Sequence, residues 1–468
     1  VVIYGAGSAG AQLINALSTV GNYKIKFIID DNKKLWGRNI GGIKIYSPEY
    51  LNKIRFKLDH ILFAIPSISL EKRKQIIYKV QDLGFSILEV PSIEEITEGK
   101  ARINNLRRIE IEDLLQRDIV QPIPELLVKG IKNKTIIITG AGGSIGSEIS
   151  LQIIKMEPKK LILLDSNEKN LYELINSFEQ FNINNNIKFI LGNCCDKKLI
   201  ANLIKKNNVE LIFHTSAYKH VNLVEENPIQ GLYNNIISTY IICNLSSKFK
   251  VPKVILISSD KAVRPRNIMG ASKRVSEILF QAFDNKFPDT CFSMVRFGNV
   301  LNSSGSVIPL FKKQIKSLSS LTVTHPEVIR YFMTIKEASQ LVIQASALAK
   351  GGEVFLLDMG EPIKILDLAK QMIKLSGLTI KNKNNLNGDL EIVFTGLRPG
   401  EKLYEELLID NNSKSTPHPL IYKAEEKYII YEKLIILLDK MEQSLKKHDL
   451  DESLLLLEQI VPEWERFS

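Results

Sequence analysis

An acid and an amine stand side by side in the segment Ser258 to Lys261, and this pair is the clearest sign of chemistry in the chain. The segment follows the apolar run Val254–Ile257, which predicts a buried parallel strand. The polar residues therefore emerge at the C-terminal end of a strand, where ligands bind in open α/β sheets. Asp260 and Lys261 could serve there as the acid and the base of one reaction.

Met269 and Lys273 follow on the helix that should come next. Because they are four residues apart, they lie on one face of that helix. The methionine side chain can act neither as an acid nor as a base. Taken alone, the Asp260–Lys261 pair would also fit a surface turn and Met269 a core position, so the flanking segments have to decide.

A glycine-rich turn opens the chain and indicates a nucleotide-binding fold. The strand Val1–Tyr4 runs into the pattern G-x-G-x-x-G over Gly5–Gly10, which a helix should follow. About 20 residues later a second strand, Lys26–Ile29, ends in Asp30-Asp31. A lone G-x-G-x-x-G pattern is weak evidence for a bound dinucleotide.

A second glycine-rich turn follows the β-branched strand Lys134–Thr139 and has the form T-G-x-x-G-x-x-G. Glycine lets the pyrophosphate of a dinucleotide approach the free amides at a helix N-terminus. Asp165 ends the next strand, where its carboxylate would accept hydrogen bonds from both hydroxyls of the adenosine ribose. A 2′-phosphate would meet that negative charge, so NAD is favoured over NADP; a helix N-cap is the alternative role for Asp165. The predicted cofactor contacts in the turn are Gly140, Gly143, Ser144, Ile145 and Gly146.

Strand-like runs alternate with helical patterns after residue 134, at 160–164, 187–191, 209–214 and 254–257. This alternation predicts an α/β fold with a doubly wound parallel sheet, of the Rossmann type, preceded by a second, smaller Rossmann-like domain. We expect that N-terminal domain over 1–95, a linker over 96–130 and a catalytic domain over 131–468. Within the catalytic domain we expect an NAD-binding core to about residue 300, a substrate-binding part over about 300–420 and C-terminal helices over 421–468.

The composition fits a soluble globular protein of two or three domains, with 468 residues, 44% hydrophobic and 24% charged. The net charge of +10 is spread over Lys-rich segments without an Arg/aromatic stripe, and it would serve a nucleotide-sugar substrate or an anionic membrane surface as well as nucleic acid. Nucleic acid is disfavoured because the sequence contains no recognition motif for it. Four cysteines without C-x-x-C spacing and six scattered histidines predict no metal site and no disulfide framework. The sequence contains no apolar run of ~18 residues that would span a membrane.

Several separated segments resemble the bacterial nucleotide-sugar 4,6-dehydratases that act on UDP-N-acetylglucosamine, within the extended short-chain dehydrogenase/reductases of the polysaccharide biosynthesis family. Related short-chain dehydrogenases carry Tyr-x-x-x-Lys where this chain has Met269 and Lys273. The resemblance covers about residues 105–420. Its segments are Glu112–Leu115, Thr139–Gly146, His214–Val221, Glu226–Pro228, Ser259–Val263, Asn267–Arg274, Val295–Leu301, Thr322–Pro326, Arg330–Thr334 and Leu397–Lys402.

The chain looks most like the long, membrane-anchored branch of this family, which serves bacillosamine-type and O-antigen sugar synthesis. In that branch, transmembrane helices precede an N-terminal Rossmann-like domain. This chain starts directly in a strand without a methionine, so we expect a trimmed chain that lacks such a segment. The resemblance then implies a full-length protein at the cytoplasmic face of the bacterial inner membrane, which assembles as a homo-oligomer.

The resemblance implies a reaction in three steps: oxidation at C4 by NAD, loss of water across C5 and C6, and return of the hydride to C6. It implies that Asp260 protonates the leaving C6 oxygen, that Lys261 removes the C5 proton and that Lys273 binds the nicotinamide ribose. The acceptor of the C4 hydroxyl proton is left open between Asp260 and a relay through Ser259 and water. Because opposite charges favour the ionised pair, a proton exchanged between Asp260 and Lys261 is the alternative to fixed roles.

The same resemblance implies further contacts. The adenine amino group would be bound by Asp196, although the segment around it, with Cys194 and Cys195, departs from the usual family pattern. Tyr218 would line the cofactor pocket, and His214 is as well explained as a core residue. The predicted substrate contacts are Lys219, Asn299, Arg330, Arg398 and Glu401. A surface ion pair is the alternative for Arg330, Arg398 and Glu401.

The sequence therefore predicts a UDP-N-acetylglucosamine 4,6-dehydratase that retains the configuration at C5 and forms UDP-2-acetamido-2,6-dideoxy-hexos-4-ulose for bacterial glycan synthesis. Three alternatives stay open. They are a C5-inverting dehydratase, a nucleotide-sugar 4-epimerase, which usually depends on the tyrosine that Met269 replaces, and a non-catalytic nucleotide sensor.

Overall fold

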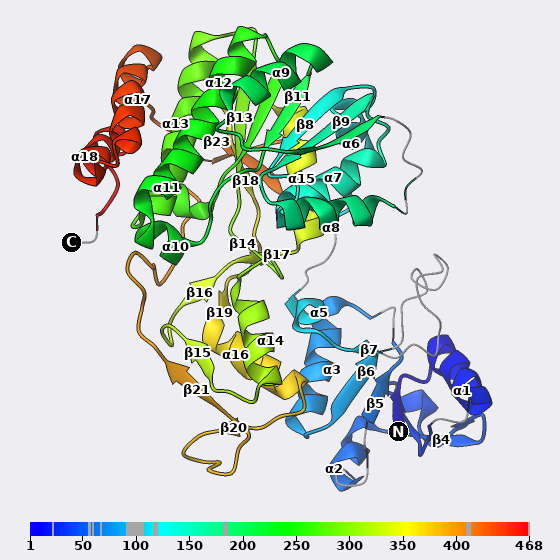
Figure 1. Cartoon of the computed structure of the whole chain (residues 1–468). Helices are drawn as coiled ribbons and strands as arrows, with labels where there is room; N and C mark the ends of the chain where they lie inside the picture. The colour runs from blue at the N-terminus through cyan, green and yellow to red at the C-terminus, as the bar shows by residue number, and fades with distance from the viewer. Residues whose placement is uncertain are drawn as a thin grey trace. The chain divides into compact units, whose positions relative to one another are not determined.

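The chain folds into two compact units in the computed structural model (Figure 1). The residues described are 1–20, 23–54, 58, 60–65, 68–89, 107–115, 120–179, 181, 186–408 and 413–466. Unit 1 consists of Val1–Asp118, Leu310–Val323 and Ile365–Thr395. Unit 2 consists of Ile119–Pro309, Thr324–Lys364 and Gly396–Ser468.

Unit 2 contains a nine-stranded sheet in the order β10, β9, β8, β11, β12, β13, β18, β23, β22. Pairing is parallel from β10 to β18 and antiparallel from there to β22. This sheet confirms the predicted doubly wound fold, and its strand order reverses between β8 and β11. The strands are β8 Thr135–Thr139, β9 Lys160–Asp165, β10 Ile187–Leu191, β11 Leu211–His214, β12 Lys253–Ile257, β13 Cys291–Arg296, β18 Val354–Leu357, β22 Ser413–Ser415 and β23 Ile421–Ala424.

Neighbouring residues of β8 pack into two different apolar cores. Ile137 joins a core with residues of α9, α12 and α13, whereas Ile136 and Ile138 join one with residues of α7 and α15. Helices lie on both faces of the sheet (Figure 1), which explains why its central strands are apolar throughout. The helices are α6 Pro124–Lys129, α7 Ser144–Ile154, α8 Glu168–Phe178, α9 Lys197–Asn207, α10 Val221–Glu226, α11 Pro228–Leu232, α12 Ser238–Lys248, α13 Ile268–Lys286, α15 Ile335–Leu348, α17 Tyr431–Lys446 and α18 Leu450–Ile460.

Unit 2 also contains several shorter elements. They are the 3-10 turn η5 Asp260–Ala262, the π-helical turn η4 Tyr233–Ile237, the parallel pair β14 Asn299–Val300 and β17 Phe332–Met333, and the antiparallel pair β16 Ile329–Arg330 and β19 Ile363–Lys364. The helix α14 Val307–Lys316 begins in unit 2 and ends in unit 1.

Unit 1 contains a seven-stranded sheet in the order β3, β4, β2, β1, β5, β6, β7. Its inner strands β4, β2, β1, β5 and β6 are parallel, so the unit has the Rossmann-like character predicted for the N-terminal part of the chain. The elements are β1 Val2–Tyr4, α1 Ser8–Val20, β2 Ile28–Ile29, η1 Lys33–Leu35, β3 Asn39–Ile40, β4 Ile43–Tyr46, η2 Pro48–Tyr50, α2 Leu51–Ile54, β5 His60–Phe63, α3 Leu70–Asp82, β6 Ser86–Glu89, β7 Arg107–Arg108 and α5 Ile111–Leu115.

Unit 1 also takes in two later stretches of the chain. They form α16 Ile365–Leu375 and a small sheet of β15 Leu321–Val323, β21 Leu390–Phe394 and β20 Ile380–Lys381. Lys374 of α16 forms an ion pair with Asp82 of α3 at 2.6 Å. The predicted substrate-binding part over about 300–420 is therefore divided between the two units. The predicted linker contributes β7 and α5 to unit 1, while its residues 96–106 lie outside the described residues.

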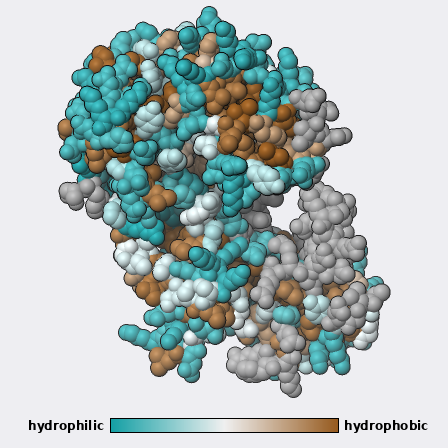
Figure 2. Space-filling model, in the orientation of Figure 1, coloured by the Kyte–Doolittle hydropathy of each residue, from teal (hydrophilic) through white to brown (hydrophobic). Residues whose placement is uncertain are grey.

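The surface in view is covered mostly by hydrophilic residues, with hydrophobic ones gathered in smaller patches (Figure 2). Among the described residues, no helix is both long and apolar enough to cross a bilayer. Within the same residues, no cluster of three or more His, Cys, Asp or Glu side chains could hold a metal ion. All four cysteines are free thiols.

Candidate active site

The glycine-rich turn of unit 2 joins β8 to α7 in a conformation that requires glycine. Gly140 has a φ of +64°, in the left-handed region. A Cβ on Gly146 would lie 2.2 Å from the Gly140 carbonyl oxygen, so the first turn of α7 can pack against the loop only without a side chain. Gly143 is the N-cap of α7, and Ser144 and Ile145 form the start of the helix beside it. The turn thus has the open backbone that a pyrophosphate needs.

Asp165 ends β9 and ties it to this turn. Its Oδ2 accepts a hydrogen bond from Gly142 N at 2.8 Å, and its Oδ1 accepts one from Asn167 N at 2.8 Å. The N-cap of α8 is Asn167, whose side chain accepts from Asn170 N, so capping is not the role of Asp165. Each oxygen of Asp165 keeps a lone pair beyond its backbone contact.

Asp196 has the capping role that Asp165 lacks. Its Oδ1 accepts hydrogen bonds from Lys198 N and Leu199 N, each at 3.0 Å, at the start of α9. The predicted adenine contact would have to come from Oδ2. His214 is a core residue: its Nδ1 lies 2.8 Å from the Thr139 hydroxyl, and burial lowers its pKa to about 3.

The Ser259–Lys261 segment forms a tight polar cluster at the end of β12. Asp260 is 2% exposed, and its Oδ1 accepts from the Ser259 hydroxyl at 2.8 Å and from Lys261 Nζ at 3.0 Å. Lys261 Nζ also donates to Asn299 Oδ1 at 3.1 Å. A Cβ on Gly298 would lie 3.1 Å from Asp260 Oδ2, so the residue before Asn299 packs closely against the carboxylate.

The protonation state of Lys261 follows from this cluster. Burial lowers the pKa of the Lys261 amine, but the carboxylates of Asp260 and Glu405 together raise it by more. The net pKa therefore lies above the ordinary value. Lys261 is therefore a cation in the resting site. A role as base requires the proton to leave first, and Asp260 Oδ1 at 3.0 Å is an acceptor within reach.

Lys273 and Met269 both lie on α13, with different surroundings. Lys273 Nζ donates to the carbonyl of Ile257, the last residue of β12, at 2.8 Å. Burial lowers the pKa of Lys273 to about 8, against the opposing effect of Glu277. Met269 is buried among apolar side chains of the core. The methionine thus fills a core position, while Lys273 reaches the strand end.

The predicted substrate residues are brought together only in part. Arg330 is buried, and its guanidinium donates to the carbonyls of Ile329, Leu403 and Lys402 at 2.7, 3.1 and 2.8 Å. Glu401 accepts from the Thr324 hydroxyl at 3.0 Å and from Arg398 N at 3.2 Å. The residue Arg398 itself is exposed.

Tyr218 and Lys219 follow β11, which is the parallel neighbour of β12. They therefore lie at the same edge of the sheet as the Ser259–Lys261 cluster. Tyr218 is 51% exposed, and its main chain forms two hydrogen bonds with the Asn235 side chain, at 2.7 and 3.0 Å. Burial lowers the pKa of Lys219, and the charge of Lys261 lowers it further. Asn235 belongs to the π-helical turn η4 and also donates to the Ser272 hydroxyl at 2.9 Å.

A buried ion network is joined to the cluster segment through Ser258. The sequence interpretation missed this network. Glu277 of α13 accepts from the Ser258 hydroxyl at 2.6 Å, from Arg296 Nε at 2.6 Å and from Arg274 Nη1 at 3.2 Å. Burial alone would raise the pKa of Glu277, but Arg296 and Arg274 lower it below its ordinary value. Buried charges are tolerated only when they are paired in this way, and the pairing fixes the end of β12 against α13.

Glu405 is the other residue that the sequence interpretation missed. Its Oε1 lies 3.9 Å from Lys261 Nζ and 3.9 Å from Arg330 Nη2. It comes shortly after the Leu397–Lys402 segment, and it is far from Lys261 in the sequence. The only available signal was its place beside that segment, because nothing in local spacing predicts a contact between chain segments so far apart.

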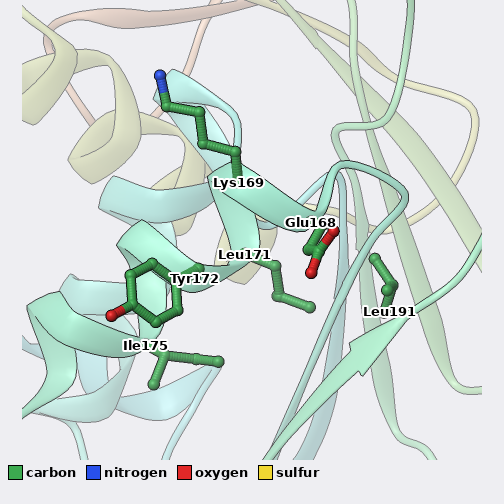
Figure 3. Close-up of a pocket in the computed structure, with 6 residues that line it drawn as sticks. All are labelled: Glu168, Lys169, Leu171, Tyr172, Ile175 and Leu191. Atoms are coloured by element: carbon green, nitrogen blue, oxygen red, sulfur yellow. The ribbon is translucent and has the colours of Figure 1, made fainter.

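A hollow of about 400 Å³ lies elsewhere on unit 2, between α8 and the edge strand β10 (Figure 3). The residues around it are Glu168, Lys169, Leu171, Tyr172, Ile175 and Leu191. None of the predicted site residues lines it, and its walls are mainly apolar, so the chemistry of the cluster is not located there.

The fold and the glycine-rich turn define a short-chain dehydrogenase/reductase scaffold of the extended kind. Residues 136–426 match the model of the family described as "Polysaccharide biosynthesis protein", and the chain belongs to that family. Residues 1–84 match a model described as "C2185-like, N-terminal".

The chain is 40% identical over 465 residues to the capsular polysaccharide biosynthesis protein CapD of Staphylococcus aureus, which covers 96% of this chain and 75% of CapD. It is 34% identical over 284 residues to a UDP-glucose 4-epimerase of Rickettsia bellii, which covers 59% of this chain and 78% of the epimerase. It is 30% identical over 301 residues to an inverting UDP-N-acetylglucosamine 4,6-dehydratase of Campylobacter jejuni, which covers 64% of this chain and 82% of that enzyme.

Among solved structures, Pen from Bacillus thuringiensis superposes with a TM-score of 0.57 at 31% identity, covering 66% of this chain and 98% of Pen. These matches fix the family and the scaffold. They include relatives named for different reactions on nucleotide sugars, so the choice among those reactions depends on the residues of the site.

Proposed function

We propose that this chain is a UDP-N-acetylglucosamine 4,6-dehydratase that uses NAD and retains the configuration at C5. The observation that carries the proposal is the buried cluster of Ser259, Asp260, Lys261 and Asn299 at the end of β12. It combines an acid, a base and a hydroxyl. An elimination needs these groups, whereas a simple hydride transfer does not need all of them. The resemblance to 4,6-dehydratases and the similarity to the Campylobacter enzyme support it.

The cofactor is NAD, held by the turn from Gly140 to Gly146. The turn packs tightly because Gly140 and Gly146 carry no side chain, so that its backbone amides can approach a pyrophosphate, and Asp165 has a free lone pair on each oxygen for a ribose hydroxyl. Lys273 of α13, whose amine reaches the end of β12, is the residue for the nicotinamide ribose. When bound, NAD supplies the acceptor for the C4 hydride and the donor that returns it to C6.

The protons then balance within the cluster. Asp260 receives the C4 hydroxyl proton, directly or through Ser259 and water. Lys261, made neutral by passing its proton to solvent, takes the C5 proton, and Asp260 gives the proton that it received from C4 to the C6 oxygen, which leaves as water. Lys261 finally returns its proton to C5. Asp260 gains one proton from the C4 hydroxyl and gives one to the C6 oxygen, so it returns to its starting state for the next turnover.

Substrate contacts are proposed for five residues. Asn299 holds a phosphate or sugar hydroxyl next to Lys261, and Lys219 lines the sugar pocket. The diphosphate and the uridine ribose are assigned to Arg398 and Glu401. Arg330 is the weaker assignment for the diphosphate, because its guanidinium is already bonded to three backbone carbonyls.

Retention at C5 is proposed because one compact Asp260–Lys261 pair at one strand end can remove and return the proton on the same face. Inversion would need a second acid on the opposite face. In D₂O, the product should carry deuterium at C5 without a change of configuration, and hydrogen from C4 should appear at C6. A 5-epimeric product in the first turnovers would instead establish the inverting reaction.

A nucleotide-sugar 4-epimerase is the alternative to the dehydratase, and one of the relatives is named as such an enzyme. It usually depends on a tyrosine at the position of Met269, and Met269 is a buried core residue here. Incubation with UDP-N-acetylglucosamine and NAD, followed by the product mass, separates the rivals. Loss of water supports the dehydratase, unchanged mass with an altered NMR spectrum supports the epimerase, and unaltered substrate supports a sensor.

The setting in the cell is proposed from the resemblance alone. We expect the full-length protein to work at the cytoplasmic face of the inner membrane, as a homo-oligomer, in bacterial glycan synthesis. Light scattering of the purified chain tests the oligomeric state.

A further inference from the structure

Glu405 carries a buried carboxyl group, and one of its two oxygens lacks a hydrogen-bond partner among the described residues. Its side chain is 5% exposed, and its Oε1 lies 3.9 Å from both Lys261 Nζ and Arg330 Nη2. Its Oε2 is buried and has no hydrogen-bond partner among the described residues. A buried carboxylate oxygen without a partner is costly, so the placement of this group beside Lys261 needs an explanation.

The charged groups that face Glu405 come from three segments. Lys261 and Asp260 belong to η5, Arg330 to β16, and Lys402 to the same loop as Glu405. Lys402 Nζ donates to the Val263 carbonyl at 2.9 Å, which fastens this loop to the residue after η5. The loop therefore holds the Glu405 carboxyl group at a fixed place beside the amine.

The proton affinity of Glu405 reflects these neighbours. Burial raises its pKa, Lys261 lowers it, and Asp260 raises it again, so that the net pKa lies above the ordinary value. Arg330 and Lys402 act in the lowering direction. Among the described residues the Lys261 amine thus has two acidic neighbours, Asp260 at 3.0 Å and Glu405 at 3.9 Å.

We propose that Glu405 is a positioning residue that sets the proton affinity of Lys261. The proposal rests on the proposed role of Lys261 as the base at C5. The carboxylate of Glu405 stabilises the ammonium that forms when Lys261 takes the C5 proton, and it keeps that proton on Lys261 until it returns to C5. Asp260 alone could not do this throughout, because it is neutral for as long as it holds the proton that it later gives to the C6 oxygen.

The test is the substitution Glu405→Gln in the whole chain, which removes the charge and keeps the shape. Loss of a carboxylate at this distance lowers the pKa of Lys261, so the neutral base exists at lower pH. The acidic limb of the kcat profile, and of deuterium uptake at C5 in D₂O, should move to lower pH by about one unit or more. KM for the nucleotide sugar should change little.

Glu406→Gln is the matched control. Glu406 is the next residue, is 47% exposed and pairs with Arg264 at 2.8 Å, so the same charge is removed at the surface. Its pH profile should coincide with that of the unchanged protein. A shift of equal size in Glu406→Gln would mean that net charge and not position is responsible, and would overturn the proposal.

Two further variants separate the possible failures. Lys261→Ala with normal turnover would refute the proposed function itself. An inactive Lys261→Ala together with an unshifted limb in a folded Glu405→Gln would refute only the role of Glu405. If Glu405→Gln fails to fold, Glu405→Asp, which draws the charge back from Lys261, should give a smaller shift in the same direction, and no shift or an opposite one refutes the proposal.

Discussion

The two glycine-rich turns of this chain are built alike. In unit 1, Asp30 accepts from Ala6 N at 2.7 Å and from Asn32 N at 2.8 Å. In unit 2, Asp165 accepts from Gly142 N and Asn167 N, each at 2.8 Å. In both turns an aspartate at the end of the second strand fastens that strand to the glycine loop.

The last glycine of each turn has the same function. A Cβ on Gly10 would lie 2.0 Å from the Gly5 carbonyl oxygen, and one on Gly146 would lie 2.2 Å from the Gly140 carbonyl oxygen. The backbone that could accept a pyrophosphate is therefore present twice. The shared geometry of the turns says nothing by itself about chemistry.

The two units differ in the residues at the ends of their later strands. In unit 2, the strand β12 ends in the Ser259–Lys261 cluster, and α13 brings Lys273 to it. In the described part of unit 1, the strand β5 is followed by Ala64 and Ile65, which are apolar. A nucleotide-type turn can place a cofactor, but reaction requires acid and base groups at a neighbouring strand end.

The largest effect is expected from the cluster of unit 2, which has no counterpart after β5 in the described part of unit 1. Lys261→Ala and Asp260→Ala should each lower turnover by ~10²–10⁴ while bound NAD stays near its normal level, since neither side chain contacts the glycine-rich turn. Turnover with UDP-N-acetylglucosamine and the nucleotide content of the purified protein measure this. Lys250→Ala, at an exposed lysine paired with Asp289, is the control and should leave both unchanged. Near-normal turnover in either site variant would contradict the assigned roles.

The two turns can be compared directly with Gly146→Ala and Gly10→Ala. Each adds the same methyl group at the same kind of contact, so each should destabilise its own unit. Only Gly146→Ala should remove the bound NAD and with it the activity. Nucleotide content after purification and thermal unfolding followed by circular dichroism separate the two effects. Loss of NAD from Gly10→Ala alone would place the cofactor in unit 1.

Lys273 should make stability depend on pH. Its pKa in the folded protein is about 8, lowered from 10.5, so between these values the unfolded chain holds a proton that the folded protein has lost. The free energy of unfolding should therefore rise with pH across this window, by at most ~3 kcal/mol. Tm measured from pH 7.5 to 10.5 should lose this component in Lys273→Met and keep it in Lys250→Met, at the exposed control site. An unchanged rise in Lys273→Met would show that another group is responsible.

Much of the fold could be predicted from the sequence because its strands are apolar and short and its turns carry glycine. The parallel sheet around β8, β9, β11 and β12 follows from that pattern, and the local cluster of Ser259, Asp260 and Lys261 follows from contiguity. Glu405 could not be predicted, because it reaches Lys261 through a loop that Lys402 fastens to Val263. The ion network of Glu277 was missed for a similar reason, since a helix interior gave no sign that charges there would be buried.

The assignment of Arg398 and Arg330 shows a related limit. Both were selected by residue type, and a guanidinium suits a diphosphate in either place. The structure distinguishes them through their existing contacts: Arg330 is bonded to backbone carbonyls, while Arg398 is exposed. Residue type predicts which chemistry is possible, whereas free hydrogen-bonding capacity depends on tertiary contacts.

The smallest expected effect, and the closest comparison, comes from Asp165→Asn and Asp30→Asn. An amide in place of the carboxylate keeps one acceptor and loses the other, so one of the two backbone contacts is broken in each unit. Asp165→Asn should weaken NAD binding about tenfold, the cost of one charge-assisted hydrogen bond, and should reduce the preference for NAD over NADP because the repelling charge is gone. Asp30→Asn should leave the amount of bound NAD unchanged.

Titration with each dinucleotide, with the number of sites per chain as a second readout, tests both statements. A second site that disappears in Asp30→Asn would mean that the turn of unit 1 also binds a dinucleotide, and the contrast between the units would then rest on the catalytic cluster alone.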